Sequence, residues 1–337
     1  MKKVVTIGGG TGSFMLLSGL KQYPIELSAI VSMADDGGST GILRDELGVL
    51  PPGDVRQCLV ALSETPDMLR ELMNYRFANG GLEGHNFGNI LLSALEKITG
   101  DFGTGVEEAA KILNVRGEVI PVTLSDTRLY MELEGGGLLS GEHEINVSKK
   151  FEHVGVKKVF LRPRPKANPL AIRKILEADL VIIGPGNHYC AIIPNLLVPG
   201  IAEALRKTKA KIVYNCNLIS KRGQTDSFSL EDYVDEVNGY IGSPRLDYVT
   251  YNIAKPPAAL LKKYQSEGLL VPFLNDRPRN YRVIRADILS GKRHARQKED
   301  KIAHTRAFIR HDPEKLARVL VMLLELEGYE SILKDIV

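Results

Sequence analysis

The chain has 337 residues, of which 44 are Lys or Arg and 41 are Asp or Glu, so its formal net charge is only +3 at pH 7. A chain of this length can bury a large core in one or two domains, and a nearly balanced charge gives no reason to expect nucleic acid as a partner. The three cysteines, Cys58, Cys190 and Cys216, form no C-x-x-C pair, which argues against a zinc site and indicates a reducing compartment.

The start of the chain shows no export or membrane signal. Residues 1–7 hold four apolar side chains before the first glycines, too few for the apolar region of a signal peptide. No stretch approaches the roughly 18 apolar residues of a membrane-spanning helix. We therefore expect a cytoplasmic protein with no membrane span.

A glycine-rich loop follows the first predicted strand, at 4–7. It reads GGGTG at 8–12, and the helical spacing of the apolar residues that follow predicts a helix over 13–23. Glycines let the backbone turn at positive φ and approach an anion at the start of a helix. The dinucleotide fingerprint G-x-G-x-x-G is only partly matched, because Ser13 stands at its third position. An anion-binding loop is one interpretation, and a tight turn without a ligand is the other.

The first hundred residues alternate between strand and helix patterns, which is typical of βαβ units and a parallel sheet. After the first strand and helix we predict a strand at 27–33 and helices at 54–63, 68–76, 89–98 and 106–113. Residues 117–164 are strand-rich, with a glycine turn at 135–137, and predict an inserted antiparallel β lobe.

The parallel pattern then returns, with continuously apolar runs that are typical of buried strands at 180–183, 212–214 and 248–251. A mobile charged loop is expected at 292–301, and Pro313 begins a last helix. We predict one α/β domain over 1–337, a Rossmann-like three-layer α/β/α fold with a mostly parallel sheet and the inserted antiparallel β lobe.

Polar and glycine-rich motifs follow the predicted strands, at 8–13, 34–41, 125–130, 184–189, 215–217 and 251–252, and two more lie near helix starts at 51–58 and 84–89. The ligand crevice of an open parallel sheet lies outside the carboxyl ends of its strands. We therefore expect these motifs to converge on a small-molecule site.

Two motifs contain residues suited to chemistry. Asp35 and Asp36 lie where an acidic residue meets a ribose hydroxyl in dinucleotide folds, and they could equally hold Mg²⁺ against a diphosphate; the alternative is a plain turn. His85 lies between glycines in GHNFGN and is either a phosphate donor or acid/base group, or a structural histidine. The sequence contains no Ser/His/Asp motif, HEXXH helix or P-loop. It therefore gives no evidence for a covalent nucleophile or for zinc chemistry.

Taken together, the motifs resemble those of the CofD-like family. They occur in family order as GGGTG, DDGGSTGILR at 35–44, PPGDVRQCLVAL at 51–62, GHNFGN at 84–89, SDTRLY at 125–130, GPG followed by IIPNLLVPGIAEAL at 192–205, NCN at 215–217, and HTRAFIRHD at 304–312. One branch of the family contains 2-phospho-L-lactate transferases, which use Mg²⁺. The other contains YvcK-type gluconeogenesis factors, and this chain resembles that branch more closely.

The resemblance implies a set of site residues. A diphosphate would lie on the loop formed by Gly9, Gly10, Thr11, Gly12 and Ser13, with Asp35 and Asp36 as catalytic residues or as ligands of Mg²⁺, the one cofactor implied. Further nucleotide-binding candidates are His85, Asn89, Gly184, Gly186, Asn187, Asn215, Asn217, Tyr264 and Arg310. Arg310 suits a diphosphate because its planar guanidinium can bind two oxygens together; an ion pair at the surface is the alternative.

Two segments depart from the YvcK-type pattern. Residues 187–191 read NHYCA where the family usually has Ser-Leu-Tyr-Thr-Ser, and 221–225 read KRGQT where it usually has Gln-Pro-Gly-Glu-Thr. Ligand preference could therefore differ from that of the family.

The resemblance favours a cytoplasmic protein that binds a nucleotide-diphosphate sugar, such as a UDP-sugar, and acts in carbon metabolism and cell-shape regulation. The alternative is an enzyme like the 2-phospho-L-lactate transferases, which would transfer a phosphorus-containing group to a hydroxyl. An NAD(P) oxidoreductase is a third reading, disfavoured by Ser13 in the fingerprint. We also expect a homodimer and a protein partner in cell-wall or carbon metabolism.

Overall fold

The computed structural model describes residues 1–148, 154–265, 268–274, 278–291 and 309–325. Within them, the central element is a seven-stranded sheet with the order β10-β9-β8-β7-β1-β2-β3, and every pair of neighbours in it is parallel. Its strands are β1 (Lys2–Gly8), β2 (Ile25–Val31), β3 (Glu118–Pro121), β7 (Leu180–Ile183), β8 (Lys211–Asn215), β9 (Tyr248–Asn252) and β10 (Arg282–Ala286). The predicted Rossmann-like α/β architecture is confirmed.

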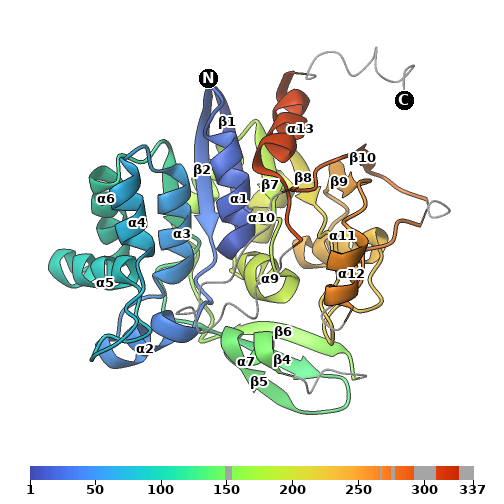
Figure 1. The fold of residues 1–337 in the computed structure, drawn as a ribbon. Helices are drawn as coiled ribbons and strands as arrows, with labels where there is room; N and C mark the ends of the chain where they lie inside the picture. Colours follow the sequence, from blue (N-terminus) through green and yellow to red (C-terminus); the bar gives the residue numbers. More distant parts are fainter. Residues whose placement is uncertain (149–153, 266–267, 275–277, 292–308, 326–337) are drawn as a thin grey trace.

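Helices flank this sheet (Figure 1). They are α1 (Gly10–Leu20), α2 (Gly38–Leu47), α3 (Gly53–Leu62), α4 (Asp67–Asn74), α5 (Phe87–Thr99), α6 (Phe102–Ile112), α8 (Pro169–Glu177), the π-helix η1 (His188–Ile192), α9 (Ile193–Leu196), α10 (Ile201–Lys207), α11 (Leu230–Ile241), α12 (Ala258–Tyr264) and α13 (Pro313–Glu325). The last helix, α13, packs against α1. A Cβ at Gly19 in α1 would lie only 2.0 Å from the carbonyl oxygen of Pro313, the first residue of α13.

A second, three-stranded antiparallel sheet has the order β5-β4-β6. It consists of β4 (Arg128–Leu133), β5 (Leu138–Ser140) and β6 (Val156–Arg162). Helix α7 (Glu142–Val147) follows β5 in the chain. We call these four elements the lobe. Figure 1 shows the lobe below the ends of β1 and β2 from which α1 and α2 continue, so it lies at the carboxyl edge of the parallel sheet.

The predicted start of the lobe at residue 117 is wrong. Residues Glu118–Pro121 form β3, which pairs in parallel with β2 at the edge of the main sheet. Three of its four residues are buried there, and an apolar run of this kind is equally compatible with either sheet. The antiparallel sheet therefore begins only at Arg128.

The five helices predicted in the first part of the chain are confirmed as α1, α3, α4, α5 and α6 to within a few residues, but α1 starts at Gly10 and not at residue 13. Glycine disfavours helix, so the sequence pattern placed the start too late. Helix α2, which follows β2, was not predicted. The expected charged loop at 292–301 lies outside the described residues.

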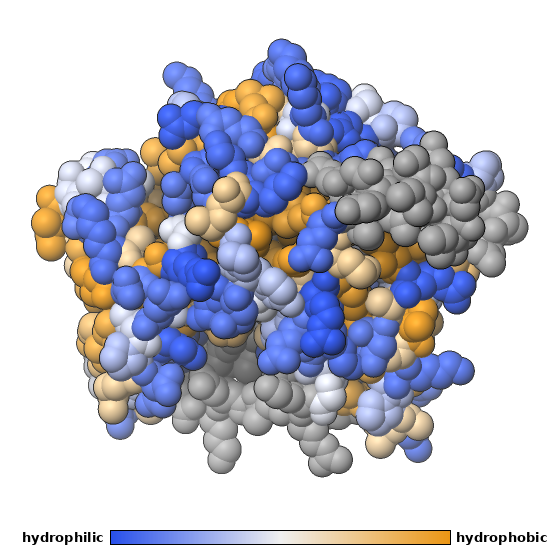
Figure 2. Space-filling view, turned by 90° about the horizontal axis from the view of Figure 1, so that it is seen from above, coloured by the Kyte–Doolittle hydropathy of each residue, from blue (hydrophilic) through white to orange (hydrophobic). Residues whose placement is uncertain are grey.

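The face seen from above in Figure 2, away from the lobe, is mostly hydrophilic, with apolar residues visible between the hydrophilic ones. Among the described residues no single helix is long and apolar enough to cross a membrane; the bent pair His188–Leu196 and Ile201–Lys207 passes that test by length and composition only.

Candidate functional site

Two glycine turns meet at the start of α1. A Cβ at Gly12 would lie 2.0 Å from the Pro185 carbonyl oxygen, and one at Gly186 would lie 3.7 Å from the Gly9 carbonyl oxygen. The loop after β1 and the loop after β7 are therefore in contact, as neighbouring parallel strands require. Gly12 is needed for this close approach, and Gly184 for its positive φ of 71°.

Two buried asparagines hold these turns. The side-chain amide of Asn195 donates to the Gly8 carbonyl at 3.2 Å and to the Ala191 carbonyl at 2.8 Å. Asn215 donates to the Gly184 carbonyl at 3.0 Å and is itself completely buried. The structure thus shows that Asn215 braces the turn at Gly184, and the expectation that it also lines the ligand crevice stays a prediction. Asn195 was not predicted, since it lies inside an apolar helical segment without a ligand-type motif.

The side chain of Asp54 lies against the glycine loop. A Cβ at Gly9 would be 2.3 Å from its Oδ2 atom, so only glycine leaves space for this carboxylate. Asp54 stands in the first turn of α3, within the PPGD motif. The motif was recognised in the sequence, but the residue was not singled out. Ser13 is also buried, and its hydroxyl lies 2.7 Å from the Cβ position of Gly8.

Asp35 and Asp36 follow β2 at the same edge of the sheet. The Gly37 amide donates to Asp35 Oδ1 at 2.9 Å, and a Cβ at Gly53 would lie 2.3 Å from Asp35 Oδ2. Asp36 Oδ1 accepts from the His143 amide of the lobe at 2.7 Å. Burial raises the pKa of both carboxyl groups. The predicted acidic pair is therefore enclosed between the sheet edge and α7.

The lobe adds a further carboxyl group, Glu142, at the start of α7. Although the residue keeps some solvent contact, burial and the nearby carboxylates of Asp35 and Asp54 raise the pKa of its side chain to about 8. Four acidic groups from three separate segments, namely the turn after β2, α3 and α7, thus share one small region. Glu142 could not be predicted as a site residue, because only the folded lobe brings it there.

These acidic groups are suited to Mg²⁺, whose preferred ligands are carboxylate, carbonyl and water oxygens. Among the residues that the structure describes, no group of three Asp, Glu, His or Cys side chains is arranged to hold a metal ion. Mg²⁺ is commonly held by one or two carboxylates together with the phosphate oxygens of its ligand. One or two of the carboxylates of Asp35, Asp36 and Asp54 therefore fit a Mg²⁺ ion whose remaining ligands would come from a diphosphate.

The family model described as 2-phospho-L-lactate transferase CofD matches residues 4–289. The chain belongs to the CofD family. It is 40% identical to the gluconeogenesis factor of Bacillus subtilis, covering 96% of this chain and 98% of that protein, and 41% identical to the putative gluconeogenesis factor of Aquifex aeolicus, covering 97% and 98%. A crystal structure of a UPF0052 family member from Bacillus halodurans superposes with a TM-score of 0.86 at 36% identity, covering 95% of this chain and 99% of that one.

The segments in which this CofD family member departs from the expected pattern meet at α7. Asn187 donates to Asn146 Oδ1 at 3.1 Å, and Lys221 Nζ donates to the same oxygen. Gln224 donates to the Ile145 carbonyl at 3.0 Å. Asn187 also accepts from the Cys190 amide at 3.3 Å and so caps η1. The residues that depart from the pattern therefore lie in the contact between the lobe and the main sheet.

Two predicted residues of GHNFGN have different roles in the structure. Asn89 is buried, and its Oδ1 accepts from Arg56 Nε at 2.8 Å, so its side chain has a partner within the protein. The expectation that it contacts a nucleotide stays a prediction. His85 is half-buried, and its Nδ1 lies 3.3 Å from the hydroxyl of Ser39, in the first turn of α2. His85 thus remains beside the loop that carries Asp35.

The C-terminal candidates lie at another part of the site. Tyr264 is buried in a small apolar cluster with Leu218 and Ile309. The expectation that it contacts the nucleotide sugar stays a prediction. Arg310 is half-buried and follows this cluster in the chain. Asn217 is also half-buried, and it precedes Leu218.

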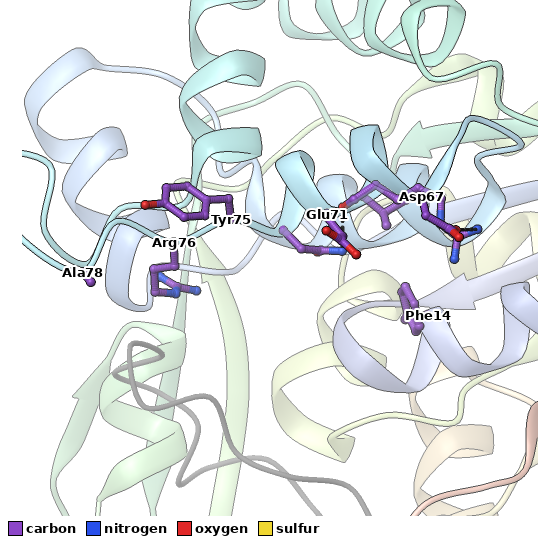
Figure 3. A pocket seen from close by; sticks show the side chains of 9 residues that line it. Phe14, Asp67, Glu71, Tyr75, Arg76 and Ala78 are labelled. Carbon is purple, nitrogen blue, oxygen red and sulfur yellow. Dashed lines mark hydrogen bonds and ion pairs between the residues drawn. The ribbon is translucent and has the colours of Figure 1, made fainter.

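A cavity of about 580 Å³ lies between α1, α3 and α4, with Val60 of α3 in its lining (Figure 3). Phe14, the residue after Ser13, forms one wall, and the opposite wall consists of α4 and the segment after it, with Asp67, Arg70, Glu71, Asn74, Tyr75, Arg76 and Ala78. Asn74 Oδ1 accepts from Arg56 at 2.6 Å, and the Arg56 charge acts on Asp35. The volume lies within the usual range for ligand pockets.

Proposed function

We propose that this CofD family member binds a nucleotide-diphosphate sugar, such as a UDP-sugar, at the site defined by Gly9–Ser13, Asp35, Asp36 and Asn187. The observation that carries the proposal is the contact between two glycine turns at the start of α1, with acidic side chains beside it. The first turn of a helix favours an anion, through its N–H groups and its dipole.

Each part of the ligand has a corresponding region. The diphosphate would lie at the glycine loop, with Mg²⁺ between its oxygens and the carboxylates of Asp35 and Asp54. The cavity between α1 and α4 would hold the nucleoside, whose base can pack on Phe14 and Tyr75. The sugar would then extend toward α7. Arg310 and Asn217 are the candidates for contacts to it from the C-terminal half of the chain.

The names of the relatives support a metabolic role. The matching proteins of Bacillus subtilis and Aquifex aeolicus are called gluconeogenesis factors, the latter putatively. We propose that ligand binding by this chain reports the level of a nucleotide sugar to carbon metabolism and cell-shape control in the cytoplasm.

The test is isothermal titration with UDP-N-acetylglucosamine, with and without Mg²⁺. We expect saturable binding that Mg²⁺ strengthens, and at about 100 times the Kd we expect the ligand to add about 2.7 kcal/mol to the free energy of unfolding. Tyr75→Ala, at a half-exposed ring, should weaken binding by about tenfold without loss of fold. A flat titration with UDP-, GDP- and ADP-sugars alike would contradict the proposal.

A second candidate function is transfer of a phosphorus-containing group to a hydroxyl, favoured by the enclosed carboxyl of Asp36. Burial raises its pKa, which brings it toward the range of an effective general base. The acceptor oxygen would attack phosphorus while Asp36 takes the hydroxyl proton, and the bond to the nucleoside monophosphate would break as that group leaves. Release of GMP from a guanosine-diphospho donor in the presence of a deazaflavin alcohol, lost in Asp36→Asn, is the expected result; no release excludes this reaction.

A further inference from the structure

We propose that Lys221, Asn146 and Asn187 form a subsite for an anionic group on the sugar, so that this protein prefers a nucleotide sugar that carries a carboxylate. The proposal rests on the proposed function, because it assigns the far end of the same ligand. The three side chains come from three segments, namely the loop after β8, helix α7 of the lobe and the turn after β7.

Hydrogen bonds fix the position of the ammonium group. Asn146 Oδ1 accepts both from Lys221 Nζ and, at 3.1 Å, from Asn187 Nδ2. All three residues are half-buried, so each retains contact with solvent. The Gln224 amide donates to the Ile145 carbonyl at 3.0 Å and fastens the same loop to α7. Lys221 is thus held at a defined place and does not extend into solvent as most surface lysines do.

This place adjoins the turn after β7, which meets the glycine loop. Asn187 directly follows Gly186, whose Cβ position lies 3.7 Å from the Gly9 carbonyl oxygen. Along α7, Glu142 and Asn146 are four residues apart, so they share one face of the helix and are separated by about 6 Å along its axis. The acidic group of Glu142 and the Lys221 contact are therefore neighbours on α7, about one turn apart.

The charges at the two ends would orient the ligand. The buried thiol of Cys190 lies close enough to both the acidic groups and Lys221 to be affected by each. Burial raises the pKa of this thiol most; Glu142 and Asp36 raise it further, and Lys221 lowers it. A carboxylate on the sugar would be attracted by Lys221, whereas the acidic end, where Glu142 stays protonated at neutral pH, offers it no positive charge. An ammonium group can donate up to three hydrogen bonds, and a ligand carboxylate would compete for Lys221 with the partners that it has in the free protein. A charge-assisted bond of this kind is stronger than the hydroxyl contact that a neutral sugar offers.

The test compares UDP-glucose with UDP-glucuronate, which differ only in the carboxylate at the sugar's sixth carbon. By isothermal titration we expect wild-type protein to bind UDP-glucuronate about tenfold more tightly. Lys221→Met should remove this preference and leave the affinity for UDP-glucose nearly unchanged. Asn146→Asp should also remove it, because the new carboxylate would compete for the ammonium group. Arg222→Gln is the matched control, since it removes the same charge from the adjacent, exposed position and should preserve the preference.

The outcomes separate this inference from the proposed function. Equal affinity of the wild type for the two nucleotides overturns the anionic subsite while nucleotide-sugar binding stands. A preference for UDP-glucuronate that survives in Lys221→Met overturns the role of Lys221. If neither nucleotide binds, the proposed function and this inference both fail.

Discussion

Gly12→Ala is expected to lower the free energy of unfolding by about 3 kcal/mol and to abolish nucleotide binding. The new methyl group would lie 2.0 Å from the Pro185 carbonyl oxygen. The atoms that it would meet belong to the backbone, which cannot move aside as a flexible side chain can. The turns after β1 and β7 would have to separate, which would displace the N–H groups at the start of α1. Urea unfolding followed by circular dichroism measures the stability, and titration of the folded variant measures the binding.

Gly239→Ala is the matched control. Gly239 lies within α11, and no atom lies within 4 Å of its Cβ position. Alanine is favoured over glycine inside a helix, so this variant should be more stable than wild type by about 0.5–1 kcal/mol and should bind normally. Equal stability of Gly12→Ala and wild type would show that the contact between the turns is not close in solution.

Glu142→Gln is expected to stabilise the protein at pH 8 but not at pH 4. The pKa of Glu142 rises from 4.5 to about 8 in the folded protein through burial and the nearby Asp35 and Asp54 carboxylates. The folded state therefore keeps a proton that the unfolded chain has lost, and wild-type stability falls as the pH rises from about 4.5 to about 8. Each pKa unit corresponds to about 1.4 kcal/mol, so glutamine, which stays neutral, should gain steadily over this window.

The measurement is urea unfolding of both proteins at pH 4, 6 and 8. Glu203→Gln is a control of opposite sign, because the hydrogen bond from Lys207 lowers the pKa of Glu203. That pair contributes stability above the ordinary pKa of glutamate, and its loss should cause a small destabilisation at pH 8. A constant difference between Glu142→Gln and wild type across the three pH values would contradict the enclosed position of Glu142.

The sequence predicts the main sheet well, because buried parallel strands are continuous apolar runs that end in glycine or polar turns. For β1, β7 and β8 the predicted strand ends agree closely with the structure. The rule that ligands gather outside the carboxyl ends of such strands also placed Asp35, Asp36 and Asn187 near the glycine loop. The strand-rich sequence and its glycine turn also predict the lobe, apart from β3, whose short apolar run fits either sheet.

The individual roles of polar side chains were harder to predict. Asn89, Asn215 and Tyr264 are of ligand-binding types, yet each is buried and used within the protein. Residue type and motif give no measure of burial, which depends on packing between segments far apart in the chain. For the same reason the sequence does not predict Asp54, Glu142 and Asn146 as site residues. Their positions follow from how α3 and the lobe pack at the sheet edge.

The lobe is fastened to the main sheet through α7, by the His143 amide on Asp36 and by Asn146 with Asn187 and Lys221. Thermodynamic linkage is reciprocal: if a ligand contacts α7, it makes detachment of the lobe more costly by the same free energy that the attached lobe adds to ligand affinity. Slower hydrogen exchange in the lobe would then report occupancy of the glycine loop. The lobe is thus the part of this fold from which a protein partner could distinguish the bound state from the free one.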